Sequence, residues 1–194
     1  MNLIENFVNG LNRFFPISFP NFFRCQTIFF FDFKRFRFLT FQGEDPEIDG
    51  VDDLKEFLAT KDAFKLLGFS AKEQSNIYKI LAGILHLGNV VFEAGQGKMD
   101  SESCSISVED ASLKYFAELF DIEADQIRKW LCNRKIVTAR ESYTKPIGAE
   151  SARFARDALA KYIYSKIFDW IVVQINKALK TSGEFFFVHI FVYF

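Results

Sequence analysis

Apolar residues between Phe154 and Leu179 recur at spacings of three and four positions, which is the pattern of one face of an α-helix. No glycine or proline interrupts the chain between Gly148 and Leu179, so the pattern predicts one long helix over this range. Its second half is nearly apolar all round, which is typical of a helix buried inside a larger body. The stripe consists of Phe154, Ala155, Ala158, Leu159, Tyr162, Ile163, Ile167, Trp170, Ile171, Ile175 and Leu179.

Shorter apolar patterns predict two helices in the acidic stretch that precedes Gly68. Asp52 or Asp53 can cap the first helix, because an oxygen of either side chain can accept a hydrogen bond from a free amide of the first turn. Thr60 or Asp62 can cap the second helix in the same way, and Gly68 is expected to end it.

Ser70 and Glu73 have the spacing of a capping box, which predicts the start of a third helix. We expect Gly88 to end that helix and His86 to have a structural role in its last turn. A short strand over residues 90–92, with a return strand near Ile106, is predicted to follow.

Ser107, with Asp110 three residues later, predicts the start of the next helix, and Asp121 is expected to cap one more. The side chains of that last helix expected to point toward the core are those of Ile127, Trp130 and Leu131. Together the patterns predict a mainly α fold with about six helices, one or two small β-hairpins and a long C-terminal helix.

The segment from Arg134 to Lys145 has the alternation of an exposed two-stranded loop. It carries four basic residues and one glutamate, a balance of +3. Composition alone favours a solvated surface loop, and contact with an acidic partner is the alternative.

The composition of the whole chain excludes several classes of function. Its 194 residues have a formal net charge of −1, which argues against bulk electrostatic binding to nucleic acid. The cysteines Cys25, Cys104 and Cys132 form no CxxC motif, so they indicate neither a disulfide framework nor a zinc site, and a reducing, intracellular setting fits them better. Two histidines do not favour a histidine metal site or a Ser/His/Asp triad. No apolar run is long enough to predict a membrane span.

Both ends of the chain have a much higher phenylalanine content than its middle. Residues 1–43 hold 13 of the 26 phenylalanines and residues 185–194 hold five, and the N-terminal cluster does not sort its apolar side chains onto one face. We therefore expect a Phe-rich segment over residues 1–42, a folded segment over 43–183 and a Phe-rich tail over 184–194. The favoured interpretation is that neither end was selected to fold with the middle, as in translated non-coding sequence. Strands packed on the core are the alternative.

Three stretches of the middle resemble the myosin motor head. They are PEIDGVDDLKEFLATKDAFKLLGFS at 46–70, NIYKILAGILHLGNVVF at 76–92, and LCNRKIVTARESYTKP at 131–146 with ARDALAKYIYSKIFDWIVVQIN after it. Their order and spacing also match the family, and LCNRK followed by TARESYTKP is most similar to unconventional heads of class V. The resemblance implies that residues 43–183 are a partial motor domain, a helical subdomain in the upper half of the family's actin-binding cleft, and that the segments 1–42 and 184–194 are non-homologous.

The resemblance also implies a binding surface. It identifies the basic segment with a loop that touches actin, and the turn that contains Lys98 with a second surface loop near actin. The implied partners are actin filaments and the remainder of a myosin heavy chain, in a cytoplasmic, cytoskeleton-associated location. The implied actin-binding residues are Arg134, Lys135, Thr138, Arg140, Glu141, Ser142, Tyr143 and Lys145.

The parent family is an actin-activated ATPase that binds ATP and Mg²⁺. It uses a GESGAGKT phosphate loop, an NxNSSRFGK-type segment and a DIxGFE-type segment, and none of these motifs occurs in this chain. We therefore expect a fragment of an actin-based motor that binds no cofactor and has no ATPase activity by itself. The alternative is a stand-alone helical module that binds actin or another acidic protein.

Overall fold

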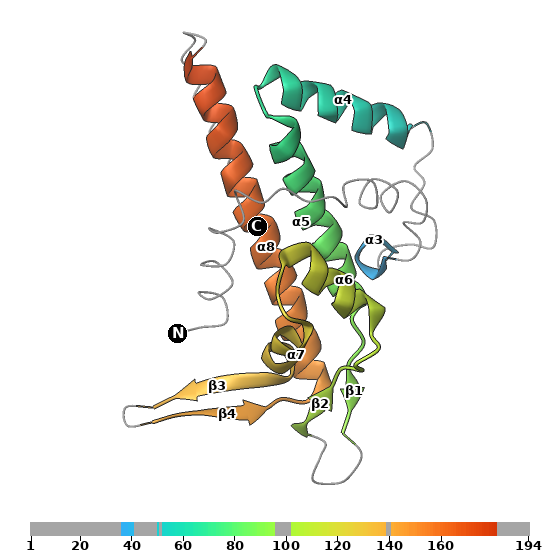
Figure 1. The fold of residues 1–194 in the computed structure, drawn as a ribbon, viewed down its shortest axis with the longest axis vertical. Coiled ribbons are helices and arrows are strands. Elements are labelled where there is room, and N and C mark those ends of the chain that lie inside the picture. Colours follow the sequence, from blue (N-terminus) through green and yellow to red (C-terminus); the bar gives the residue numbers. More distant parts are fainter. Residues whose placement is uncertain (1–35, 41–49, 51, 96–101, 139–140, 182–194) are drawn as a thin grey trace.

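The computed structural model describes residues 36–40, 50, 52–95, 102–138 and 141–181. These residues confirm a mainly α fold with two small antiparallel hairpins and a long C-terminal helix. Figure 1 shows α5 and α8 running side by side in opposite directions, with α4 at one end of the pair and both hairpins at the other. The elements are α3 (Arg37–Thr40), α4 (Asp53–Leu66), α5 (Ala71–Asn89), β1 (Glu93–Ala94), β2 (Cys104–Ser105), α6 (Ala111–Phe120), α7 (Ala124–Cys132), β3 (Asn133–Val137), β4 (Ser142–Pro146) and α8 (Ala149–Thr181).

Most of the two predicted Phe-rich segments lies outside the described residues, and their boundaries stay predictions. The exception is residues 36–40, which the structure places against the core. Phe36 is buried, with its ring edge-on to the ring of His86 at 5.3 Å, and Phe38 packs against the main core cluster. His86 therefore packs as a core residue in the last turn of α5, with the ring of Tyr115 at 4.9 Å.

The predicted capping box opens α5. The Ser70 hydroxyl accepts a hydrogen bond from the Glu73 amide at 3.2 Å, and the Glu73 carboxylate accepts one from the Ser70 amide at 2.8 Å. The prediction that Gly88 ends this helix is wrong, because α5 continues to Asn89. The residue is small for a packing reason: a Cβ atom there would lie 2.6 Å from the ring of Phe38.

A second glycine brings α5 and α6 together. The Phe120 ring of α6 occupies the space that a Cβ atom on Gly83 would need, so the two helices approach closely at this point. The cluster around this contact is the main core and draws on α5, α6, α7 and α8. Its largest fully buried side chains are Leu87, Val90, Leu113, Phe116, Phe120, Leu131 and Ile163.

The two helices predicted before Gly68 form one continuous helix, α4. Its cap is Asp52, whose carboxylate accepts a hydrogen bond from the backbone amide three residues later at 3.1 Å. Neither Thr60 nor Asp62 begins a second helix. The Thr60 hydroxyl instead donates to the Glu56 carbonyl oxygen at 2.9 Å, a contact made within an unbroken helix. Gly68 follows the end of α4 with φ of 80°, the left-handed conformation predicted there.

The first strand forms later than predicted. Residues 90–92 are not in a strand, and the Val91 amide donates to the Asp110 carboxylate at 3.2 Å instead of to a paired strand. The side chains of Val90 and Phe92 are buried in the core. Pairing with the return strand therefore begins at Glu93, in the β1–β2 hairpin.

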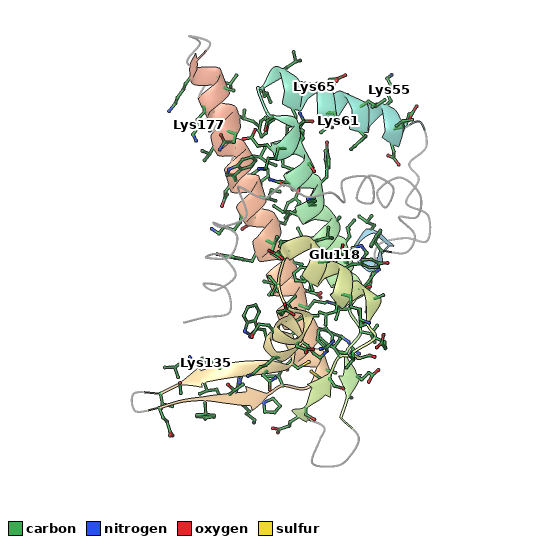
Figure 2. All side chains as sticks on the ribbon, viewed as in Figure 1. Lys55, Lys61, Lys65, Glu118, Lys135 and Lys177 are labelled. Carbon is green, nitrogen blue, oxygen red and sulfur yellow. The ribbon has the colours of Figure 1, made fainter. Side chains whose placement is uncertain are left out.

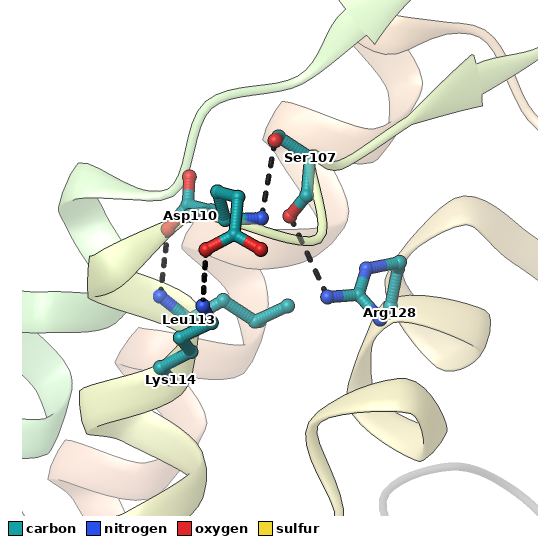
Figure 3. Close-up of polar contacts among 6 residues, drawn as sticks. Ser107, Asp110, Leu113, Lys114 and Arg128 are labelled. Atoms are coloured by element: carbon teal, nitrogen blue, oxygen red, sulfur yellow. Dashed lines mark hydrogen bonds and ion pairs between the residues drawn. The ribbon is translucent and has the colours of Figure 1, made fainter.

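Figure 3 shows that Asp110, rather than Ser107, caps α6: its carboxylate accepts a hydrogen bond from the Leu113 amide at 2.7 Å. The Ser107 carbonyl oxygen accepts from the Asp110 amide at 3.2 Å and lies 3.5 Å from a guanidinium nitrogen of Arg128. Asp121 does not cap α7 as predicted. It ends α6 in the left-handed conformation, with φ of 51°.

The long helix is confirmed as α8, but its buried face differs from the predicted stripe. Phe154 is 69% exposed, and Ala155 and Ala158 are also exposed. Beyond Ile167 the remaining apolar residues are only partly covered or exposed, so the second half is not buried all round within the described residues. The buried residues of α8 are Ala152, Arg156, Leu159, Ala160, Ile163 and Ile167.

Arg156 is a charged residue on the buried face of α8. Its side chain is 4% exposed, and one guanidinium nitrogen donates to the carbonyl oxygens of Gly88 at 3.1 Å and Val90 at 3.2 Å, where α5 ends. The neighbouring Asp157 carboxylate lies 2.7 Å from a second nitrogen, which compensates the buried charge. Helix ends leave carbonyl oxygens without intrahelical donors, and a charged donor here satisfies them.

Replacing Arg156 with Met should lower the free energy of unfolding by about 3 kcal/mol, because two buried carbonyl oxygens would lose their donor. Arg153→Met removes the same charge from an exposed position of α8 and should cost less than about 0.5 kcal/mol. Urea unfolding of both variants, followed by circular dichroism, measures the difference. Equal losses would contradict the role given to Arg156.

Candidate functional site

The basic segment forms the predicted hairpin, which projects from one end of the helical body (Figure 1). β3 follows α7 directly, and β4 is joined to α8 by two residues. The Ile147 amide donates to the Cys132 carbonyl oxygen at 3.0 Å, which closes the base of the hairpin. Near the tip, the Thr138 amide donates to the Glu141 carbonyl oxygen at 2.8 Å. The hairpin is thus paired from its base to residues 138 and 141.

The register divides the basic residues between the two faces of the hairpin. The antiparallel ladder pairs Arg134 with Lys145 and Lys135 with Thr144. Since successive side chains of a strand point to opposite faces, Lys135 lies on the face opposite to the other two basic residues. Figure 2 shows Lys135 on β3. One face carries Arg134, Ile136, Tyr143 and Lys145, and the other carries Lys135, Val137, Ser142 and Thr144.

Every predicted binding residue that the structure describes is solvent-exposed. The Tyr143 ring, the large aromatic group of this hairpin, is 50% exposed. Arg140 and Lys98 lie outside the described residues, so their placement stays a prediction. The exposed set is Arg134, Lys135, Thr138, Glu141, Ser142, Tyr143 and Lys145.

Sequence reasoning missed Glu102, which lies beside the base of the hairpin. Its carboxylate accepts a hydrogen bond from the Lys145 ammonium at 2.9 Å, across 43 positions of sequence. Lys145 stands directly opposite Arg134, and two like charges at paired positions destabilise a ladder. Glu102 therefore offsets a repulsion built into the hairpin. The polar run around Glu102 showed no pattern that could have identified it.

The hydrogen bond from Lys145 and its positive charge lower the pKa of Glu102 below the ordinary value for a glutamate. A lowered pKa means that the folded state favours the charged carboxylate. The contribution of this pair to stability is therefore present above the ordinary pKa of glutamate and is lost as the pH falls through the lowered value.

The described residues contain no cluster of three or more His, Cys, Asp or Glu side chains that could hold a metal ion. A hollow between the α4–α5 connection and the end of α8 is lined by residues that include Phe69, Glu73 and Lys177. The Glu73 carboxylate already accepts hydrogen bonds from the amide and hydroxyl of Ser70 in the capping box, so it is committed to a structural role. None of the helices in the described ranges has the length and apolar character needed to cross a membrane.

Comparison with known proteins defines the class. The sequence profile of the myosin head (motor domain) family matches residues 24–191, which is most of the chain. The chain therefore belongs to the myosin head family.

Within that family the relatives include several class V myosins, which confirms the class V-like resemblance. Unconventional myosin-Vb of Homo sapiens is 48% identical over 145 residues, which is 75% of this chain and 8% of that protein. Unconventional myosin-Va of Gallus gallus is 48% identical over 143 residues, 74% of this chain and 8% of the relative. Myosin-7 of Arabidopsis thaliana is 42% identical over 146 residues, again 74% and 8%. The chain thus spans about 8% of the length of these relatives.

The interaction of Glu102 with Lys145 makes a testable prediction. We expect the pKa of Glu102, measured by NMR titration of its side-chain carboxyl carbon, to lie below the ordinary value and to rise in Lys145→Met, because both the hydrogen bond and the charge would be lost. Lys135→Met removes the same charge from the opposite face of the hairpin and should change this pKa much less. An unaltered pKa in Lys145→Met would show that the pair does not form in solution.

Proposed function

We propose that this chain is part of an actin-based myosin motor and contributes to its actin-binding surface through the β3–β4 hairpin. The observation that carries the proposal is the hairpin itself, an exposed, paired projection whose residues 134–145 have a balance of +3 in a chain of net charge −1. The membership of the chain in the myosin head family supports actin as the partner. A cytoplasmic, cytoskeleton-associated location follows from the same proposal.

The charged side chains and the aromatic side chain of this surface would have different roles. Exposed charges such as Lys135 would raise the rate of encounter with an acidic filament, while groups that become buried on contact would set the lifetime of the complex. The half-exposed ring of Tyr143 is suited to the second role, because an aromatic side chain brings a large contact area. Lys98, in the loop between β1 and β2, would add one charge from a second segment.

We further propose that the polypeptide has no ATPase activity alone. Phosphoryl transfer depends on positioned backbone amides, a lysine, a Mg²⁺ ligand and an oriented water. The three family motifs that supply these groups do not occur in this sequence. In a complete motor, ATP and Mg²⁺ would be bound by other segments of the heavy chain, toward which α8 would lead.

Charge reversal tests the binding surface. Lys135→Glu should weaken co-sedimentation with actin filaments roughly three- to tenfold at low salt, with a smaller difference as the salt concentration rises, because exposed charges are screened. Arg140→Glu should act in the same direction.

The matched control is Lys55→Glu, which makes the same change in charge on α4, at the opposite end of the molecule (Figure 2). It should leave binding nearly unchanged. If Lys135→Glu and Lys55→Glu weaken binding equally, only the net charge matters and the hairpin is not the contact.

A phosphate-release assay tests the second proposal. The chain incubated with ATP and Mg²⁺ should release phosphate at the rate of the blank, both with and without actin filaments, because it lacks the groups that position the γ-phosphate. Turnover above the blank that copurifies with the chain would refute this proposal and leave the binding surface untouched.

A further inference from the structure

Cys104 and Cys132 lie against each other at the base of the basic hairpin. Cys104 is the first residue of β2 and Cys132 is the last residue of α7, two elements that are in contact, and each thiol affects the pKa of the other. Both belong to the main core region, where Cys132 is buried and Cys104 is half-buried. A disulfide needs its two cysteines on neighbouring segments, and the contact between α7 and β2 brings both thiols to the same part of the core.

Arg128 holds the two segments together independently of the cysteines. It precedes Cys132 by four residues, so both side chains lie on the same face of α7. Its guanidinium donates to the Ile106 carbonyl oxygen at 3.0 Å, two residues beyond Cys104, and also pairs with Asp125. The face of α7 that carries Cys132 is therefore fastened to the strand that carries Cys104.

We propose that Cys104 and Cys132 are a modification site: a hydroperoxide oxidises them to a reversible intramolecular disulfide that fixes the base of the basic hairpin to the β1–β2 hairpin. This inference does not depend on the proposed actin contact.

The chemistry is balanced by one molecule of hydrogen peroxide. The more accessible Cys104 sulfur, as the thiolate, attacks one peroxide oxygen, the O–O bond breaks, and Cys104 becomes a sulfenic acid as the first water forms. The Cys132 thiolate then attacks the Cys104 sulfur, the S–O bond breaks, and the hydroxide leaves as a second water after taking a proton. Two thiols and one peroxide give one disulfide and two waters, and the sulfurs supply the two electrons.

The burial of the two thiols makes their oxidation slow near neutral pH. Burial raises the pKa of the Cys104 thiol above its ordinary value, and burial raises the pKa of Cys132 to about 12, against a smaller lowering by the charge of Arg128. Since the thiolate is the reacting form, oxidation is slow near neutral pH and faster in mildly alkaline buffer.

The consequence for the hairpin follows from the chain connectivity. β3 begins at Asn133, immediately after Cys132, and the Cys132 carbonyl oxygen accepts the hydrogen bond from the Ile147 amide that closes the hairpin base. A disulfide at Cys132 would therefore restrain the opening of that hydrogen bond while leaving the tip free.

Peptide mapping of the full chain tests the site without any substitution. Trypsin would release Cys25 in peptide 25–34, Cys104 in peptide 99–114 and Cys132 in peptide 130–134. After treatment with hydrogen peroxide at about pH 8.5, we expect peptides 99–114 and 130–134 to be recovered joined and lighter by two hydrogens, and to separate on reduction.

Two controls sharpen the result. The chain oxidised in denaturant should give all three pairings of its cysteines, and Cys25→Ser should leave the native product unchanged. A native sample with the same mixture of pairings as the denatured one, links between chains, or unlinked cysteines would overturn the proposal.

Hydrogen exchange tests the structural consequence in the same sample. Oxidation should slow exchange of the Ile147 amide about threefold or more, while the Thr138 amide near the tip keeps its rate. Equal rates for Ile147 in the reduced and oxidised chains would show that the disulfide does not fix the hairpin base.

Discussion

Arg156 joins the start of α8 to the end of α5, and both hairpins leave the helical body near this junction. The guanidinium fills two needs at once, because the last carbonyl oxygens of α5 require donors and the apolar surroundings tolerate a charge only when it is paired. The rings of Phe38 and Phe92 lie 5.7 and 5.9 Å from its central carbon and shield it from water. Together with the buried apolar face of α8, this side chain fixes the start of α8 against the end of α5, close to the point where the basic hairpin leaves.

The basic hairpin has no apolar core of its own and depends on the elements at its root. Its strands are continuous, or nearly so, with α7 and α8, and its base is closed by the hydrogen bond from Ile147 to Cys132. A strand pair this small is marginal in water unless it is anchored. The anchoring leaves its side chains free for charge, and Glu102 of the neighbouring hairpin offsets the repulsion that this charge creates. The ion pair between Glu102 and Lys145 therefore links the two hairpins.

The elements that could be predicted are those specified by neighbours in sequence. The capping box at Ser70, the left-handed Gly68 and the alternation after Arg134 each depend on a few adjacent residues, and each appears in the structure. Some errors were local choices between neighbouring cap residues, and others arose where a distant contact decided the outcome. Gly88 looked like a helix terminator, but a ring from residue 38 explains it. Arg156 was not singled out by any sequence pattern, although it lies four residues after the buried Ala152. The signal that could have revealed the buried Arg156 is its position at helical spacing from the apolar residues of the buried face.

The way the basic hairpin is rooted has a mechanical consequence. A force that pulls on its tip acts along both strands together, so it does not peel the ladder apart pair by pair from one end. The tension divides at the root, where one strand passes it to α7 and the other passes it through Ile147 and Gly148 into α8. With 33 residues, α8 is a strut roughly 50 Å long, since each residue adds about 1.5 Å. A load collected at one end of the molecule would reach the other end through a single rigid element.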